Sequence, residues 1–143
     1  FVGKEALVYV NARVSDNAWV SGNARISTTA WVSGNAWVYG NAWVSDNAQV
    51  LGNARISNTA WVSGDARIYG NVHLKETPLV VSIPGTHNSV VITKTDILFN
   101  GNVRFIEEWR YITEEALKQL GSKELVPYKK HIFELADTFR NNN

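Results

Sequence analysis

The sequence predicts a mainly β fold, in which a parallel β-solenoid is followed by a small α+β module. The first observation is an insertion-free repeat: Ala occupies every sixth position over residues 6–66, and Val72 continues the series. The second is a Val, Ile or Leu two places after each of these positions. The third is a change of composition at Pro78, after which 16 of the 27 charged residues occur. These observations divide the chain of 143 residues into two predicted domains, 1–77 and 78–143.

Each six-residue unit predicts one short strand and one corner. The Ala-x-aliphatic spacing is the period-two alternation of a strand, and a period of six does not fit the stripe of a helix. The remaining positions carry Ser-Gly-Asn, Ser-Asp-Asn or Tyr-Gly-Asn, and both Gly and Asn tolerate the positive φ that a repeated corner needs. Twelve such units over residues 6–77 predict short strands that coil as a parallel β-solenoid.

The units resemble the hexapeptide-repeat superfamily, whose signature is a small residue, any residue, an aliphatic residue and then a turn. The segments AWVSGN and ARISTT fit this signature. The resemblance implies a left-handed parallel β-helix of triangular section with three hexads per coil, so that residues 6–77 make about four coils. This fold serves acyltransferases, carbonic anhydrases and non-enzymes, so the repeat by itself implies no single activity.

The segment 78–143 predicts a four-stranded, two-helix module. Asn100-Gly101 between two apolar runs is a strong hairpin signal, and apolar residues then follow helical spacing. A solenoid needs its open end covered, so we expect a cap or oligomerisation module. The expected elements are strands over 79–83, 90–93, 97–99 and 103–105, a turn over 84–89, a helix over 106–120 closed by Gly121, and a second helix over 128–139, opened by Ser122 with Pro127 in its first turn.

The whole chain also resembles hexapeptide-repeat proteins of bacteriophages and prophages. This resemblance is based on the Ala-x-Val array and on the segments PGTHNSVVITKTD and GNVRFIEEW that follow it. Related sequences pair SGNARVSGNA arrays with a similar tail. The resemblance implies a phage-associated protein in the cytoplasm of the host bacterial cell. It brings no catalytic residues that carry over to this chain.

The position between Ala and the aliphatic residue points outward and carries five of the six Trp. That many exposed Trp side chains exceed what solubility favours, so we expect lateral association into a dimer or trimer. The alternative is that the rings lie flat along the sheets as stiffening ladders. At 18 residues per coil, one predicted column holds Trp19, Trp37 and Arg55 and another holds Arg25, Trp43 and Trp61, while Trp31, Arg13 and Arg67 are also outward.

The interleaving of Trp and Arg suggests a binding function. Trp stacks on a nucleobase and Arg pairs with phosphate, so clefts between associated solenoids could hold a nucleotide, such as a host immune signal. The leading hypothesis is therefore a non-enzymatic, self-associating solenoid that binds a host component or nucleotide. The phage resemblance points to counter-defence as its setting.

Two alternatives come from other classes. The resemblance to hexapeptide acyltransferases implies coenzyme A-dependent acyl transfer, in which His73, two residues before Lys75, acts as a general base. However, no excursion loop breaks the hexads over His73. A purely structural oligomer, joined through its Trp faces, is the other alternative. His87 in the turn PGTHNS is a candidate for anion binding, with a plain hairpin turn as the simpler interpretation.

Composition excludes several further classes. Without Cys there is no disulfide framework or Cys-ligated zinc, and the three His residues are too scattered for the zinc site of a hexapeptide carbonic anhydrase. We therefore expect no metal and no cofactor. A net charge of +1 provides no strong nucleic-acid signal, and no apolar run is long enough to span a membrane. Because the chain has no Met, we expect that Phe1 is not the natural start of translation.

Overall fold

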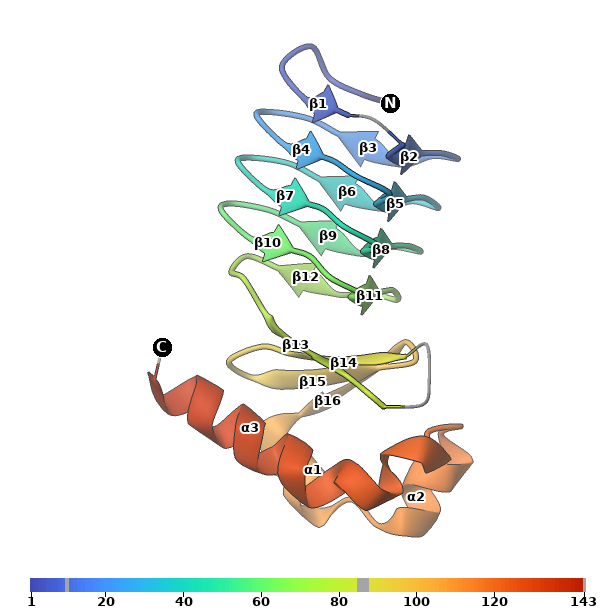
Figure 1. Ribbon diagram of the computed structural model, residues 1–143, viewed down its shortest axis with the longest axis vertical. Coiled ribbons are helices and arrows are strands. Elements are labelled where there is room, and N and C mark those ends of the chain that lie inside the picture. The colour runs from blue at the N-terminus through green and yellow to red at the C-terminus, as the bar shows by residue number, and fades with distance from the viewer. Residues whose placement is uncertain (10, 85–87, 143) are drawn as a thin grey trace.

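The computed structural model describes residues 1–9, 11–84 and 88–142, and within them the first part of the chain is a stack of twelve very short strands (Figure 1). Each strand holds the outward residue and the aliphatic residue of one repeat unit. The strands are β1 Leu7–Val8, β2 Arg13–Val14, β3 Trp19–Val20, β4 Arg25–Ile26, β5 Trp31–Val32, β6 Trp37–Val38, β7 Trp43–Val44, β8 Gln49–Val50, β9 Arg55–Ile56, β10 Trp61–Val62, β11 Arg67–Ile68 and β12 His73–Leu74.

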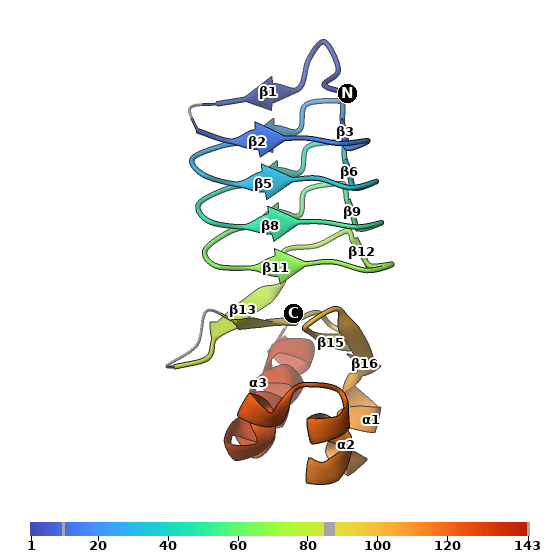
Figure 2. The ribbon, with the colours of Figure 1, turned by 90° about the vertical axis from the view of Figure 1, so that its right-hand side faces the viewer.

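These strands form three parallel four-stranded sheets, which run along the stack as three faces (Figures 1 and 2). Face A holds β3, β6, β9 and β12, face B holds β1, β4, β7 and β10, and face C holds β2, β5, β8 and β11. Each strand pairs with the strand three places later in the chain, as Trp19 pairs with Trp37 and Arg25 with Trp43. The predicted solenoid of about four turns is confirmed.

The interior is filled by the Ala and aliphatic positions of the repeat. From Ala18 to Ile68 every one of these side chains is fully buried, because alternate residues of each strand point inward. Val8 in the first coil is 38% exposed, since less of the chain lies above it. The inward side chains are therefore fully buried only after the first coil.

The corners combine left-handed backbone with stacked side chains. Gly34 has a φ of +70°, and a Cβ at that position would lie 2.9 Å from the backbone N of Gly52 in the next coil. Beside such corners, Asn side chains form a ladder in which each amide Nδ2 donates to the Oδ1 of the Asn in the next coil. Its members are Asn17, Asn35, Asn53 and Asn71, with N···O distances of 3.1–3.3 Å.

A further rung precedes the predicted array. Val2 forms a parallel bridge with Val20, and the Phe1 ring centroid lies 4.3 Å from that of Trp19. Phe1 and Val2 thus continue the outward and aliphatic positions of face A one rung earlier than the predicted start at residue 6.

The chain then forms an antiparallel sheet of four strands in the order β13-β14-β15-β16. The predicted positions of these strands hold within a residue or two. Gly101 at the β15–β16 hairpin has a φ of +75°, which is why Gly follows Asn100 there. The strands are β13 Leu79–Ser82, β14 Ser89–Ile92, β15 Asp96–Phe99 and β16 Asn102–Phe105.

The helical part differs from the two predicted helices. The first is broken, because Ile112 is extended and Thr113 begins a new helix by accepting a hydrogen bond from the Ala116 backbone N–H at 3.1 Å. The stretch around Pro127 is a 3-10 helix rather than the first turn of the last α-helix. The described residues therefore contain α1 Ile106–Tyr111, α2 Glu114–Gln119, the 3-10 helix η1 Lys123–Tyr128 and α3 Lys129–Asn142.

The antiparallel sheet lies between the last coil and the helices (Figure 2). Val91 and Leu98 join the solenoid core, with Val80 packed beside them. Val90, Ile92 and Ile97 belong to a second core that includes Trp109 and the helices. The sheet therefore covers the end of the solenoid with one face and binds the helices with the other. No helix among the described residues is long and apolar enough to cross a membrane.

Candidate functional site: a groove on face A and the cavity below it

The outward side chains stack in columns set by the strand pairing. Face A presents Trp19, Trp37, Arg55 and His73, face B presents Leu7, Arg25, Trp43 and Trp61, and face C presents Arg13, Trp31, Gln49 and Arg67. The two columns expected from the sequence are thus brought together, and His73 extends the first. Arg67 is half-buried, and its Nη1 lies 3.5 Å from Asn88 Oδ1, so it belongs to the contact with the C-terminal module.

The five outward Trp rings are held against the solenoid but stay accessible. Their exposed fractions lie between 37% and 46%. Trp43 and Trp61 stack at 5.0 Å with an interplanar angle of 10°. The indole N–H of Trp43 donates to Ser27 Oγ at 3.0 Å, and Trp31 and Trp61 make the equivalent bonds to Ser15 and Ser45. The rings of faces A and B therefore form ladders, and Trp31 adds exposed apolar area on face C.

A groove of about 480 Å³ runs along face A beside the Asn ladder. The guanidinium carbon of Arg55 lies 5.3 Å from the Trp37 ring centroid, a cation–π contact. Arg55 forms no ion pair with any described residue. The groove therefore combines an aromatic ring, an unneutralised cation and amide groups. Its lining is Asn35, Trp37, Asn53, Arg55, Asn71, Val72 and His73.

His73 closes the lower end of this groove. Its Nε2 lies 2.9 Å from Ser57 Oγ and 3.2 Å from Tyr39 Oη. Burial lowers the pKa of His73, and the nearby Lys75 and Arg55 lower it further because they repel a second positive charge. The lowered pKa favours the neutral form of His73, and two cations, Lys75 and Arg55, lie near this end of the groove.

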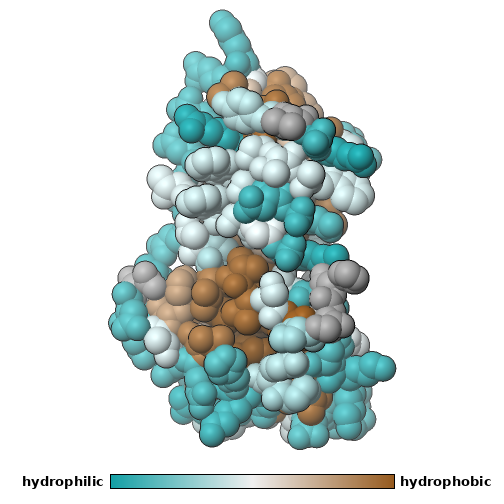
Figure 3. Space-filling model, viewed as in Figure 1, coloured by the Kyte–Doolittle hydropathy of each residue, from teal (hydrophilic) through white to brown (hydrophobic). Residues whose placement is uncertain are grey.

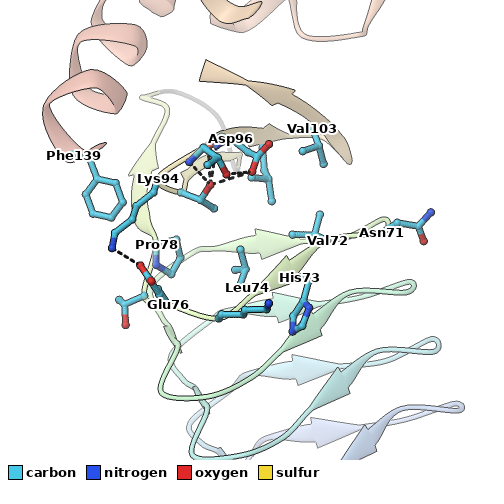
Figure 4. A pocket seen from close by; sticks show the side chains of 15 residues that line it. Asn71, Val72, His73, Leu74, Glu76, Pro78, Lys94, Asp96, Val103 and Phe139 are labelled. Atoms are coloured by element: carbon cyan, nitrogen blue, oxygen red, sulfur yellow. Dashed lines mark hydrogen bonds and ion pairs between the residues drawn. The ribbon is translucent and has the colours of Figure 1, made fainter. Parts of the chain in front are cut away.

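A second cavity, of about 610 Å³, lies between the last coil and the C-terminal module (Figure 4). It shares the lining residues Asn71, Val72 and His73 with the groove, so the two lie next to each other. An ion pair of 2.8 Å between Glu76 and Lys94 joins the two sides of its rim. Apolar lining comes from Val72, Leu74, Pro78, Leu98, Val103 and Phe139.

Several functional groups here were not expected from the sequence. Tyr39 and Ser57 occupy corners and contact His73 only because successive coils bring positions 34 and 16 residues apart together. Lys94 and Phe139 reach the cavity from the module. His87 lies outside the described residues. Within the described part of the chain, no cluster of three or more His, Cys, Asp or Glu residues is placed to hold a metal.

Comparison with known proteins supports the solenoid. The family model described as YdcK Beta solenoid repeat matches residues 12–28 and 30–46, which span β2 to β7. No curated protein and no solved structure matches the chain significantly. Over these two segments the chain is therefore similar to the YdcK β-solenoid repeat, in agreement with its coils.

Proposed function

We propose that the chain is a non-enzymatic β-solenoid that self-associates and binds a nucleotide in the groove of face A. The proposal includes a left-handed β-helix of the hexapeptide-repeat kind, since the hexads of the sequence fit that signature. The resemblance to phage and prophage proteins supports a counter-defence role in the cytoplasm of the host bacterium.

The observation that carries the proposal is the pairing of Trp37 with an unneutralised Arg55 inside a groove. An aromatic ring gives a nucleobase a stacking surface, and a guanidinium binds phosphate oxygens through two parallel hydrogen bonds. The Asn amides beside them supply donors and acceptors for a base edge. His73 and Lys75 add donors at the lower end, where phosphate charge would be balanced.

Calorimetry with a panel of cyclic and linear nucleotides tests this proposal. We expect Arg55→Gln to weaken binding by about tenfold or more, because it removes the charged phosphate partner. The matched control is Arg25→Gln on face B, which leaves the groove intact and should keep the affinity. Absence of binding heat for every nucleotide in the panel would eliminate the nucleotide hypothesis.

Binding should also depend on pH through His73. A phosphate beside the imidazole stabilises its charged form, so the lowered pKa of His73 rises in the complex and a proton is taken up. We therefore expect tighter binding at about pH 6 than at about pH 8. Titrations in buffers of different ionisation enthalpy measure the proton uptake. His73→Gln corrects for titration of the ligand itself, and an equal uptake in that variant would contradict the assignment to His73.

Self-association is expected to use the Trp faces. Replacing Trp37 and Trp43 with Ser removes apolar area from faces A and B, and we expect the variant to have a lower mass by light scattering than the parent. Phe105→Ser, at a 60% exposed aromatic side chain of the module, serves as the control. An unchanged mass in the Trp37→Ser, Trp43→Ser variant would argue against association through these faces.

The acyltransferase alternative is favoured by one observation, a neutral His73 beside a cavity. Against it, the Nε2 atom already contacts the hydroxyls of Ser57 and Tyr39. An acyltransferase would retain acyl-coenzyme A and lose turnover in His73→Ala. A purely structural oligomer would bind neither nucleotide nor acyl-coenzyme A.

A further inference from the structure

The last strand of face A has an open edge that the preceding strands do not have. In each coil, two backbone N–H groups of face A donate to carbonyl groups of the next coil. Arg55 donates to Val72 O at 2.7 Å and Ser57 donates to Leu74 O at 2.9 Å. The equivalent donors of the final rung are the N–H groups of His73 and Lys75, and neither has an acceptor among the described residues.

At the other two faces, residues that follow the last coil lie against the end strand. Below face B, Thr77 Oγ1 accepts the Trp61 backbone N–H at 3.1 Å. Below face C, β14 packs against β11, and Ser89 Oγ donates to the carbonyl of Asp65 at 2.9 Å. Of the three end strands, β12 is the one whose edge borders the 610 Å³ cavity.

The 610 Å³ cavity borders β12 on the side where another rung of face A would lie. One wall consists of the consecutive residues 71–78, and the opposite wall comes from the C-terminal module, with Asp96 and Val103 across from Leu74 in Figure 4. The Asn ladder also ends at this point, because the Nδ2 of Asn71 donates to no described residue. The cavity therefore gives an extended chain access to the backbone donors of β12.

We propose that β12 and this cavity bind an extended peptide segment of a partner protein, which adds a parallel strand to face A. Open strand edges are templates for such addition, in which main-chain hydrogen bonds supply affinity and side-chain pockets supply specificity. The peptide carbonyls accept from His73 and Lys75, and a peptide N–H donates to the His73 carbonyl. This inference does not rest on the nucleotide proposal, because it is argued from the backbone edge of β12 rather than from Trp37 and Arg55; the two sites meet at His73 and Lys75.

The lining defines the chemistry of the peptide. Leu74, Pro78, Leu98 and Val103 give the cavity an apolar lining, which favours an aliphatic residue in the peptide. Lys75 makes no ion pair with any described residue, whereas Lys94 is already paired with Glu76. An acidic residue at the outward position balances the Lys75 charge. The partner segment is therefore a small-acidic-aliphatic sequence in extended form.

Residue-resolved amide exchange by nuclear magnetic resonance tests the proposal with the capped peptide Ac-NAEVSG-NH2. We expect the peptide at millimolar concentration to slow exchange of the His73 and Lys75 amides by about tenfold or more, with chemical-shift changes centred on β12. The same peptide N-methylated at its Val lacks the donor for the His73 carbonyl and should have no such effect. The NAKVSG peptide should bind more weakly to the parent chain, and Lys75→Glu should reverse that preference.

Two further variants separate this site from others. Val103→Trp fills the cavity from the module side and should abolish peptide binding, while Arg55→Gln should leave it unchanged. Unaltered exchange at His73 and Lys75, or equal binding of the N-methylated peptide, would overturn the proposal. Nucleotide binding by the Val103→Trp and Arg55→Gln variants is measured on the same samples. It separates a failure of the face A groove from a failure of the peptide site.

Discussion

Replacing Gly34 with Ala will lower the free energy of unfolding by about 3 kcal/mol or more, the sum of two effects. The first is backbone strain, because the φ of +70° lies in the left-handed region, which costs a residue with a Cβ about 1–2 kcal/mol. The second is a collision: the new Cβ would lie 2.9 Å from the backbone N of Gly52, which cannot move without disturbing the next coil. Urea denaturation followed by circular dichroism measures the loss.

Gly64→Ala separates these two effects. Gly64 has a φ of +64°, similar to that of Gly34, but nothing lies within 4 Å of the position of its Cβ. This variant should therefore lose only the strain contribution of about 1–2 kcal/mol. Equal losses of unfolding free energy in Gly34→Ala and Gly64→Ala would contradict this expectation. They would show that neighbouring coils move apart at the corner, so that the close approach of Gly52 adds nothing to the loss.

The second large effect is expected at Trp109 in the C-terminal module. Trp109 is 3% exposed, and its indole N–H donates to the carbonyl of Lys129 at 3.1 Å. Trp109→Ala leaves a void between α1 and α3 and an acceptor without its donor, so we expect a loss of about 3–5 kcal/mol. Loss of the module's protected amides, measured by hydrogen exchange, locates the effect within residues 78–143.

Tyr111 provides the control for Trp109 because it lies in the same helix and is 77% exposed. Tyr111→Ala should change the free energy of unfolding by less than about 0.5 kcal/mol. A similarly small effect of Trp109→Ala would mean that the second core does not depend on its largest side chain.

The solenoid was predictable because the residues of each repeat unit specify both its strand and its corner. Ala and an aliphatic residue two places apart specify an inward pair such as Ala36 and Val38, and the Gly or Asn that follows specifies a corner. With three units per coil, the same pattern also placed Trp37 above Arg55. The face A column therefore followed from the repeat length together with the three units per coil that the hexapeptide-repeat resemblance implies.

The groove and cavity required information that local patterns lack. The contact of Tyr39 with His73 joins a corner of one coil to a strand two coils later, and the cavity exists only because the module docks below β12. Helical spacing continues across Ile112 and Thr113, so it could not reveal that the Thr113 hydroxyl starts a new helix there. Side-chain capping outweighed periodicity at that point.

The fixed register of the ladders also determines how the chain reaches its native state. Strand partners such as Trp19 and Trp37 are always one coil apart, so the loop that must close for each new rung stays the same length however many coils are already formed. Folding can therefore proceed by adding one coil at a time, without the slow search for distant partners that limits most β proteins. Unfolding should begin at the loosely packed first coil, where Val8 is exposed, and progress toward the end held by the module.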